Sequence, residues 1–480
     1  MTVPGNDAAP ISISDLVRRT ARSKPDAIAL VDGTHRLTWS ELDARATSAA
    51  LALREAGLED GDRVVLQLGT GLDFVALYLG AGRAGLITVP VNPAYTAPEL
   101  QHVLDDCGAR QLVRPETVPQ GVAGDDPRRD RSGEEIAVLL YTSGTSGLPK
   151  GAMLSSRALL ANLAQLAAVE PPLVTGDDVA FLPVPLFHVF GLNAGLGVAL
   201  HAGATTVLAE RFDATEALYQ IAAHRVSVVV GAPGMFAELV RHDLGAVFAS
   251  VRYALSGSAP LPPALAREYA ARDITLYEGY GLTEAAPGVT LNRTGKPGSI
   301  GAPLPGVEIE LRDADGSPVA EDDDPGELVV RGPNLFSGYW PSGDGGPDAD
   351  GWFATGDIAV RDDDGDLSLV GRSSELVLVN GFNVYPAEVE SVLRVQPGVA
   401  EVAVVGADDP RTGEAVVAYV VPAAGATLDP EQLVAAASRS LAKFKLPRDV
   451  RVVDELPHTV TGKVMKWRLR PGLANGGMPK

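Results

Sequence analysis

Residues 141–151, YTSGTSGLPKG, decide how the rest of this chain is interpreted. They follow an apolar run, residues 136–140, that has the length and composition of a buried strand. Glycines let backbone N–H groups converge on an anion, while Ser and Thr hydroxyls and a lysine add donors and positive charge. Two interpretations are open, a polar surface turn and a phosphate-binding loop. A Walker A loop is excluded, because GxxxxGK[ST] cannot be threaded through the stretch.

Composition limits the classes of protein. The chain has 480 residues, of which 46% are hydrophobic, so we expect more than one domain with large cores. Its formal net charge of −21 argues against nucleic acid or an anionic membrane as partner. The single cysteine, Cys107, excludes an internal disulfide framework and indicates a reducing compartment. Its surroundings, DDCGARQ, predict a structural thiol.

The N-terminal residues MTVPGNDAAP lack a basic region followed by an apolar core, so no signal peptide is expected. No apolar run reaches the length of a membrane span. We therefore expect a cytoplasmic monomer or homodimer without integral membrane association.

Helical patterns alternate with short apolar strands over much of the chain, which predicts parallel α/β layers. Thr38 and Glu41 have capping-box spacing ahead of one such helix. The run VSVVV is almost entirely apolar or β-branched, as is typical of a strand buried on both faces. The predicted strands cover residues 63–68, 87–91, 179–182, 205–208, 226–230, 253–256 and 275–277.

The pattern changes from residue 300 onward to strand, turn and strand, with acidic turns at residues 313–316, 321–326 and 362–365. This predicts an antiparallel sheet or a small barrel. Beyond Arg372 a compact unit begins, in which Pro386 opens a helix to about residue 396 and Asp429 begins another to about residue 443. The fold class is α/β. We expect an N-terminal domain, residues 1–373, of layered α/β subdomains plus a small barrel-like β subdomain, and a small α+β C-terminal domain, residues 374–480.

Further stretches carry chemistry-bearing residues. LSGSAPL (255–261) and YEGYGLTE (277–284) each follow a predicted strand, where α/β sheets place ligand loops. WFATGDI (352–358), GRSSELVLVNGFNVYPAEVE (371–390) and TVTGKVMKWRLR (459–470) come later. In this order and spacing, YTSGTSGLPKG, YGLTE, TGD, GR…GFNVYP and TGK resemble the core motifs of the ANL superfamily of adenylate-forming enzymes. That superfamily includes acyl-CoA synthetases, adenylation domains of peptide synthetases and luciferases, and the resemblance extends from about residue 38 to residue 470.

The resemblance implies a reaction in which ATP converts a carboxylate to an acyl adenylate with release of pyrophosphate, followed by attack of the coenzyme A thiol. Catalysis of the first step is mostly positioning and charge neutralisation. ATP, Mg²⁺ and coenzyme A are the implied cofactors. Glu284 would bind Mg²⁺, which suits a carboxylate, and Thr283 would contact the α-phosphate. Lys463 would reach the oxygens between the carboxylate and the α-phosphate, and His188 in PLFHVFG would lie between the ATP and acyl pockets.

The remaining implied site residues fall into three groups. The phosphate-binding residues are Thr142, Ser143, Gly144, Thr145, Ser146, Gly147 and Lys150. The nucleotide-binding residues are Ser258, Glu278, Gly279, Tyr280, Gly281, Asp357 and Arg372. Asn380, Gly381 and Arg211 are expected near coenzyme A. The simpler alternatives are a solvated lysine for Lys463, a turn aspartate for Asp357, a surface ion pair for Arg372 and a solvated arginine for Arg211.

The resemblance also implies that the C-terminal domain is mobile and rotates between the two half-reactions. The hinge falls on Ser374, where relatives usually carry Lys or Asp, and Asn380 stands where related ligases often have lysine. Gly381 would keep the pantetheine tunnel open, because a side chain there would obstruct it.

The acid is constrained by the stretches that line the family's pocket. None of them contains Lys or Arg to pair with a second carboxylate, which disfavours malonate-type substrates. The peptide-synthetase aspartate is absent, since Phe187–His188 stands in place of Phe–Asp. Small residues leave room for a long apolar channel; they are Gly191, Gly231, Gly234, Ala285, Ala286 and Gly288. We therefore expect a medium- or long-chain fatty acid, with an aryl acid of the coumarate or benzoate type, or transfer to a carrier protein, as alternatives.

Overall fold

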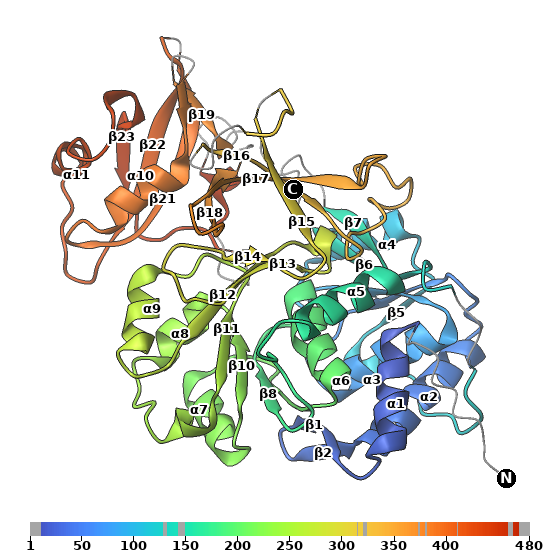
Figure 1. Ribbon diagram of the computed structural model, residues 1–480. Helices are drawn as coiled ribbons and strands as arrows, with labels where there is room; N and C mark the ends of the chain where they lie inside the picture. Colours follow the sequence, from blue (N-terminus) through green and yellow to red (C-terminus); the bar gives the residue numbers. More distant parts are fainter. Residues whose placement is uncertain are drawn as a thin grey trace. The chain divides into compact units, whose positions relative to one another are not determined.

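The computed structural model describes residues 11–127, 132–142, 149–313, 315–319, 324–372, 375–379, 382–409, 411–458 and 464–469 (Figure 1). The chain divides into two compact units. The first comprises Met1–Ile309 and Val330–Phe353, and the second Glu310–Val329 and Ala354–Lys480. The domain boundary expected after residue 373 stays a prediction. No helix within the described ranges is long and apolar enough to cross a bilayer.

A nine-stranded sheet dominates the first unit, with the strand order β14-β13-β12-β11-β10-β8-β9-β1-β2. The six strands from β12 to β1 in this order pair in parallel, and antiparallel strands close both edges. The parallel layers predicted from the sequence are thereby confirmed. The bounds are β1 Ile28–Asp32, β2 His35–Thr38, β8 Val179–Leu182, β9 Thr205–Leu208, β10 Val228–Gly231, β11 Tyr253–Ser256, β12 Leu276–Gly281, β13 Gly288–Asn292 and β14 Ala302–Pro303.

The same unit holds a five-stranded sheet with the order β5-β3-β4-β6-β7. Its strands are β3 Arg63–Leu66, β4 Ile87–Pro90, β5 Gln111–Val113, β6 Ile136–Thr142 and β7 Lys150–Ser155. All pair in parallel except β6 and β7, which are antiparallel and place Thr142 opposite Lys150. The strand predicted before YTSGTSGLPKG is therefore present, and both described ends of that stretch lie on one hairpin.

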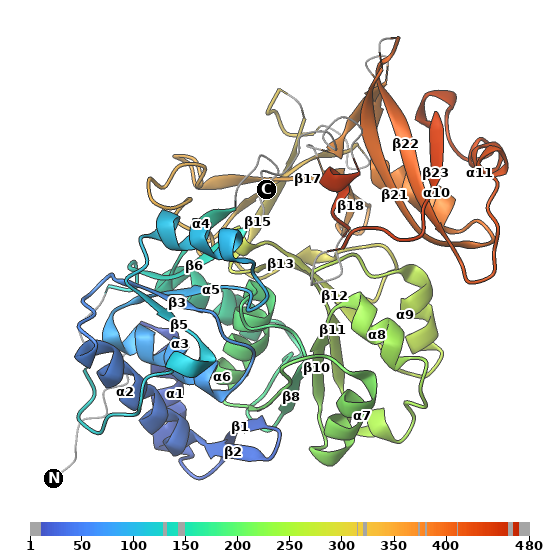
Figure 2. The same ribbon diagram turned by 180° about the vertical axis from the view of Figure 1, so that it is seen from behind.

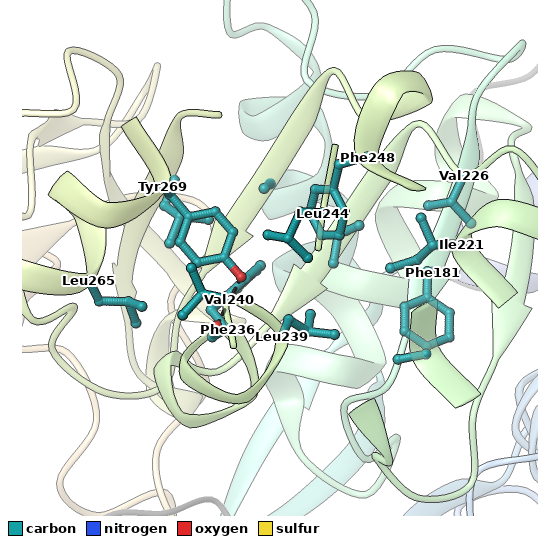
Figure 3. Close-up of a cluster of buried hydrophobic side chains, with 14 of the residues drawn as sticks. Phe181, Ile221, Val226, Phe236, Leu239, Val240, Leu244, Phe248, Leu265 and Tyr269 are labelled. Carbon is teal, nitrogen blue, oxygen red and sulfur yellow. Dashed lines mark hydrogen bonds between the residues drawn. The ribbon is translucent and has the colours of Figure 1, made fainter. Parts of the chain in front are cut away.

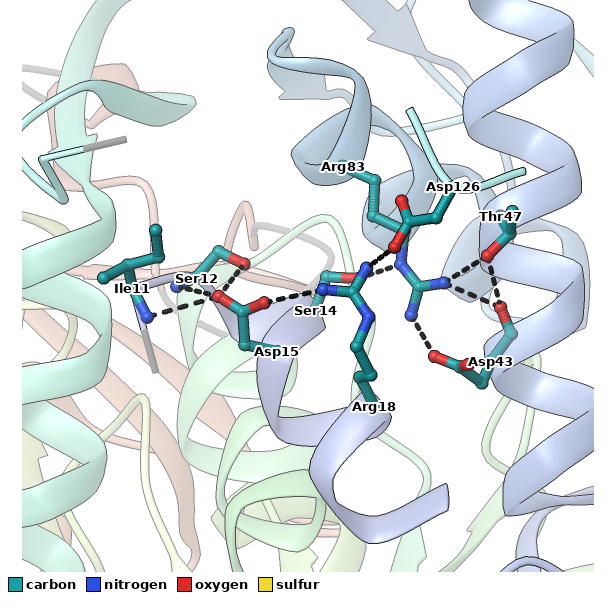
Figure 4. Close-up of polar contacts among 9 residues, drawn as sticks. All are labelled: Ile11, Ser12, Ser14, Asp15, Arg18, Asp43, Thr47, Arg83 and Asp126. Atoms are coloured by element: carbon teal, nitrogen blue, oxygen red, sulfur yellow. Dashed lines mark hydrogen bonds and ion pairs between the residues drawn. The ribbon is translucent and has the colours of Figure 1, made fainter. Parts of the chain in front are cut away.

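The α2 helix (Trp39–Glu55) begins at the capping box that the sequence predicts. Thr38 caps α2, accepting a hydrogen bond from Glu41 N at 3.2 Å, while Thr38 N donates to Glu41 Oε2 at 2.8 Å. A buried arginine then ties three helices together (Figure 4). Arg83 of α3 (Leu72–Ala84) donates to Ser14 of α1 (Ile13–Ser23) at 2.7 Å and pairs with Asp43 of α2. The same unit also contains α4 (Ala97–Cys107), α5 (Ser156–Ala167) and α6 (Val198–Ala202).

An apolar cluster of the nine-stranded sheet lies against α7 (Ala214–Ala223), α8 (Pro233–Leu239) and α9 (Pro263–Ala270) (Figures 2 and 3). Phe236 and Tyr269 meet edge to face, with ring centroids 5.8 Å apart, and the Tyr269 hydroxyl donates to Phe236 O at 2.9 Å. Burial of these rings fixes β10, β11 and β12, and hence the loops that leave their carboxyl ends.

The second unit contains most of a four-stranded sheet, β15-β16-β17-β18. Its strands are β15 Glu308–Arg312, β16 Gly326–Arg331, β17 Trp352–Arg361 and β18 Leu367–Arg372. A further sheet follows the order β20-β19-β22-β21, with β23 beside β22. Its elements are β19 Val377–Val379, β20 Phe382–Val384, β21 Val399–Asp409, β22 Gly413–Pro422, β23 Asp449–Val452, α10 Pro386–Arg394 and α11 Pro430–Ala437.

Two predicted helices of the second unit are present, and one was predicted too long. Pro386 occupies the first turn of α10, as predicted. Asp429 caps α11 through a hydrogen bond from Glu431 N at 2.9 Å, but this helix ends at Ala437, well before residue 443. The chain continues as Ser-Arg-Ser, and serine favours turns over helix interiors.

Candidate active site

Three chemistry-bearing stretches of the first unit lie at the carboxyl ends of neighbouring strands in the nine-stranded sheet. His188 follows β8, and Ser258 follows β11. Tyr280 lies at the end of β12, and the Thr283–Ala285 turn comes next. Strands β8, β10, β11 and β12 are consecutive neighbours in the sheet and run in parallel, so the loops at their carboxyl ends are adjacent. The sequence predicted this arrangement for the loops after β11 and β12.

The Thr283–Ala285 turn is built so that only glycine fits at its start. A Cβ on Gly281 would lie 2.1 Å from Pro287 O, and Leu282 N donates to that same carbonyl at 3.0 Å. The chain therefore folds back on itself immediately after β12. This fixes the backbone that carries Thr283 and Glu284.

Buried asparagine side chains hold the far end of this turn. Asn162 of α5 donates to Gly288 O at 2.9 Å and accepts from Gly288 N at 3.1 Å. Asn334 donates to Ala285 O at 2.8 Å, and Asn193 to Ala286 O at 2.7 Å. The roles of these three asparagines were not predicted from the sequence. The sequence shows only an amide side chain among apolar neighbours, and this does not identify the backbone group that the amide contacts.

Glu284 is half-buried and accepts a hydrogen bond at Oε1 from the Tyr339 hydroxyl over 2.6 Å. Among the described residues, no cluster of three or more His, Cys, Asp or Glu side chains could hold a metal ion. Mg²⁺ in nucleotide enzymes usually takes one or two carboxylates and completes its shell with phosphates and water. A single accessible carboxylate such as that of Glu284 fits that requirement.

Lys150 is exposed at the start of β7, and its Nζ lies 5.6 Å from the centroid of the Tyr339 ring. Thr142 faces it across the hairpin. The phosphate-loop residues Ser143, Gly144, Thr145, Ser146 and Gly147 lie outside the described residues, as do Ser374, Asn380, Gly381 and Lys463. Their expected roles stay predictions.

His188 lies just before a π-helix, η2 (Phe190–Gly197), a rare element that is frequent at functional sites. Its ring packs at 4.9 Å against Phe187, and burial lowers its pKa to about 4, so the imidazole is neutral at pH 7. Within the described part of the chain, the buried Nε2 has no hydrogen-bond partner. A buried polar atom without a partner is costly, and a bound ligand group would satisfy it.

The loop after β11 has a strained residue and a buried anchor. Ser258 is exposed, with a positive φ of 71°. Leu261 N donates to Glu278 Oε1 at 2.9 Å, which ties the end of the loop to β12. Burial raises the pKa of Glu278 to about 7. Glu278 thus holds the loop expected to contact adenine, while its direct contact with a nucleotide stays a prediction.

Asp357 and Arg372 belong to the second unit and sit opposite each other on β17 and β18. Asp357 is buried, whereas Arg372 is 38% exposed, and the two side chains form an ion pair. Arg372 thus forms an ion pair with a buried carboxylate rather than with a surface one, and its expected contact with the nucleotide stays a prediction. Elsewhere, Arg211 is exposed just before α7, and Cys107 is buried with a pKa raised to about 11 by burial, as suits a structural thiol.

The glycines expected to open a long acyl channel are mostly closed against neighbours. A Cβ on Gly191 would lie 2.2 Å from Pro185 O, and one on Gly288 would lie 2.9 Å from Leu304 Cδ1. On Gly231 it would lie 3.1 Å from the Phe236 ring, and at Gly234 it would meet open space. Gly191, Gly231 and Gly288 therefore allow close packing at their own positions, and the long acyl channel stays a prediction.

The chain is similar to known enzymes over almost its whole length. Residues 17–340 match the AMP-binding enzyme family, and residues 388–463 match the AMP-binding enzyme C-terminal domain. A feruloyl-CoA synthase from Amycolatopsis sp. is 38% identical, with 94% of this chain and 97% of that protein aligned. The long-chain-fatty-acid–CoA ligase FadD13 from Mycobacterium tuberculosis is 32% identical, with 96% of this chain and 98% of that protein aligned.

A solved structure agrees with the fold. O-succinylbenzoate coenzyme A synthetase from Bacillus subtilis, in complex with ATP and a magnesium ion, superposes with a TM-score of 0.86 at 28% identity, covering 95% of this chain and 98% of that one. The fold is that of an adenylate-forming enzyme. The chain belongs to the AMP-binding enzyme family, in the ANL superfamily, and is an acid–thiol ligase of the AMP-forming acyl-CoA type.

Proposed function

We propose that this protein activates an aryl monocarboxylic acid of the hydroxycinnamate or benzoate type with MgATP and transfers the acyl group to coenzyme A. The observation that carries the aryl assignment is the closing of Gly191, Gly231 and Gly288 against their neighbours, which favours a short slot over a long channel. The 38% identity to a feruloyl-CoA synthase supports the same choice.

In the first step a carboxylate oxygen attacks the α-phosphorus, and the bond to the bridging oxygen of pyrophosphate breaks. The Thr283–Ala285 turn, fixed by its asparagines, holds Thr283 and Glu284 rigid during this attack, so little reorganisation is needed. Glu284 would hold Mg²⁺, which neutralises phosphate charge when bound. Asp357 would accept the ribose hydroxyls, and Lys463 would align carboxylate and phosphate.

His188 would separate the acid from the nucleotide. Its imidazole is neutral, so it can orient a carboxylate by donating one hydrogen bond without adding charge. Phe187 packs against the same ring. In the second step the coenzyme A thiolate attacks the acyl carbonyl and AMP leaves.

A medium- or long-chain fatty acid is the second candidate substrate. GFNVYP is similar to the corresponding stretch of fatty acyl-CoA synthetases, FadD13 aligns over 96% of this chain, and Gly234 borders open space. The third alternative is transfer of the acyl group to a carrier protein in place of coenzyme A. No contact among the described residues favours this alternative.

A pyrophosphate-release screen separates these candidates. Purified protein is given MgATP with ferulate, coumarate, benzoate, octanoate or palmitate, and thioesters are then measured by chromatography after addition of coenzyme A. We expect ferulate or coumarate to give the highest kcat/KM. Higher kcat/KM for palmitate would replace the aryl assignment with the fatty-acid one. Formation of an acyl adenylate without a coenzyme A ester, even after coenzyme A is added, would exclude the proposed transfer to coenzyme A.

A further inference from the structure

Tyr339 contacts two residues from separate ATP-site motifs. Its hydroxyl donates to Glu284 Oε1 over 2.6 Å, and Nζ of Lys150 lies 5.6 Å from its ring centroid. Glu284 and Lys150 are 134 positions apart in the sequence, and Tyr339 belongs to neither of their motifs. One side chain therefore joins the expected metal ligand to a cation of the expected phosphate loop.

Backbone hydrogen bonds hold the segment that carries this tyrosine, residues 336–340, along β7. They run from Met153 N to Gly338 O at 3.0 Å, from Ser337 N to Met153 O at 2.9 Å and from Trp340 N to Gly151 O at 2.8 Å. The segment thus behaves as a short strand added to the phosphate-loop hairpin, and its position follows that of β7.

The same segment is tied to the Thr283–Ala285 turn. Phe336 N donates to Glu284 O at 2.8 Å, and the Phe336 ring meets the Tyr339 ring edge-on at 5.1 Å. Gly338 has a φ of 92°, and a Cβ there would lie 1.9 Å from Gly343 O, so glycine is required for this path. Backbone and side-chain contacts together fix the direction of the Tyr339 hydroxyl.

We propose that Tyr339 is a positioning residue of the adenylation step: its hydroxyl orients the Glu284 carboxylate for Mg²⁺, and its ring holds Lys150 over the same phosphates. This rests on the proposed function. Hydrogen bonds to a ligating carboxylate set its orientation, and their removal typically costs about 10- to 100-fold in metal affinity. Lysine has a flexible four-carbon stem, so a ring face below its ammonium limits where the charge can go.

The test measures ATP binding by calorimetry, with and without Mg²⁺, in the wild type, Tyr339→Phe, Tyr339→Leu and Lys150→Met. In Tyr339→Phe we expect the Mg²⁺-dependent gain in ATP affinity to fall by about 10-fold, with unchanged affinity in the absence of Mg²⁺. Tyr339→Leu and Lys150→Met should each weaken ATP binding in the absence of Mg²⁺. The double variant Tyr339→Leu/Lys150→Met should bind ATP no more weakly than the weaker of the two single variants, because both substitutions remove the same contact. Tyr219→Phe is the matched control, because Tyr219 is 64% exposed on α7.

The outcomes are distinct. If Tyr339→Phe keeps the wild-type ratio of affinities with and without Mg²⁺ while the wild type binds MgATP and releases pyrophosphate with an acid, the role of Tyr339 is refuted and the proposed function stands. If the wild type binds no MgATP, both fall. Circular dichroism and Tm establish folding, and should Tyr339→Leu not fold, Tyr339→Phe and Lys150→Met decide the question.

Discussion

Arg372 Nε lies 3.0 Å from Oδ1 of Asp357, and the two residues face each other directly across β17 and β18. Asp357 is only 8% exposed in its side chain, so Arg372, the last residue of β18, holds a buried carboxylate in the middle of β17. An arginine that fixes a carboxylate by charge-assisted hydrogen bonding also orients the remaining oxygen. The pair is thus suited to present one aspartate to a polar ligand.

The first prediction concerns this pair. Asp357→Asn should lower kcat/KM for ATP by at least about 10-fold, since the amide loses the charge-assisted acceptor role expected toward ribose hydroxyls. Steady-state kinetics at varied ATP measures this. Glu308→Gln, which removes the exposed Arg331 ion pair, is the control and should change little. Equal effects of the two substitutions would count against a nucleotide role for Asp357.

The second prediction is a pH dependence of stability. Burial raises the pKa of Glu278 from its usual value near 4.5 to about 7 in the folded state. Below pH 4.5 both folded and unfolded chains carry the proton, so no stability is lost. As pH rises from 4.5 to 7 the unfolded chain releases the proton more readily, and stability falls by about 3 kcal/mol.

Glu278→Gln removes this titration and keeps an acceptor for Leu261 N. We therefore expect the difference in Tm, Glu278→Gln minus wild type, to increase as the pH is raised from 5 to 8. Calorimetric Tm values of both proteins across this range provide the measurement. A difference that stays constant with pH would show that Glu278 does not titrate there.

The third prediction separates the two half-reactions. Lys463→Ala should lose adenylation but still convert supplied acyl adenylate to acyl-CoA, whereas Gly381→Leu should adenylate normally and fail to form the thioester. Lys463 is expected to act in adenylation and Gly381 in thioester formation, so the two substitutions should affect different steps. Pyrophosphate release and thioester formation are assayed separately. Equal failure of both variants in both assays would contradict a two-conformation mechanism.

The fourth prediction concerns the turn that carries Glu284. Asn162→Ala should destabilise the fold by about 1–3 kcal/mol, because it leaves Gly288 N buried without its acceptor. Asn162→Asp keeps the acceptor for Gly288 N but loses the donor to Gly288 O, so we expect the adenylation rate to fall in both variants. Urea unfolding and pyrophosphate release test the two consequences. Wild-type stability in Asn162→Ala would show that water or another group replaces the amide.

Local features of the fold could be predicted well. The Thr38 capping box, the first-turn position of Pro386 and the strand before YTSGTSGLPKG depend on residues within a few positions of one another. Parallel pairing followed from runs of apolar residues that only a sheet buried on both faces can accommodate. Family motifs then indicated which loops carry the site.

Other features of the site depend on residues distant in sequence. Tyr339 and Glu284 are 55 positions apart, and Asn162 and Gly288 are 126 apart. No spacing rule relates such pairs, since packing of separate elements brings them together. The glycines show the same limit, because a missing side chain can mean an open channel or a close backbone contact.

The sequence alone determined the parallel layers, the helix starts and the order of the adenylation motifs, because these depend on local hydrogen bonding and on hydrophobic periodicity. The tertiary structure decided that Gly191 and Gly288 are filled positions, that Glu278 anchors a loop and that Tyr339 joins Lys150 to Glu284. Those facts depend on which atoms meet across the packed interior. The space beside a glycine, for example, can be filled by the backbone or a side chain from a distant part of the sequence.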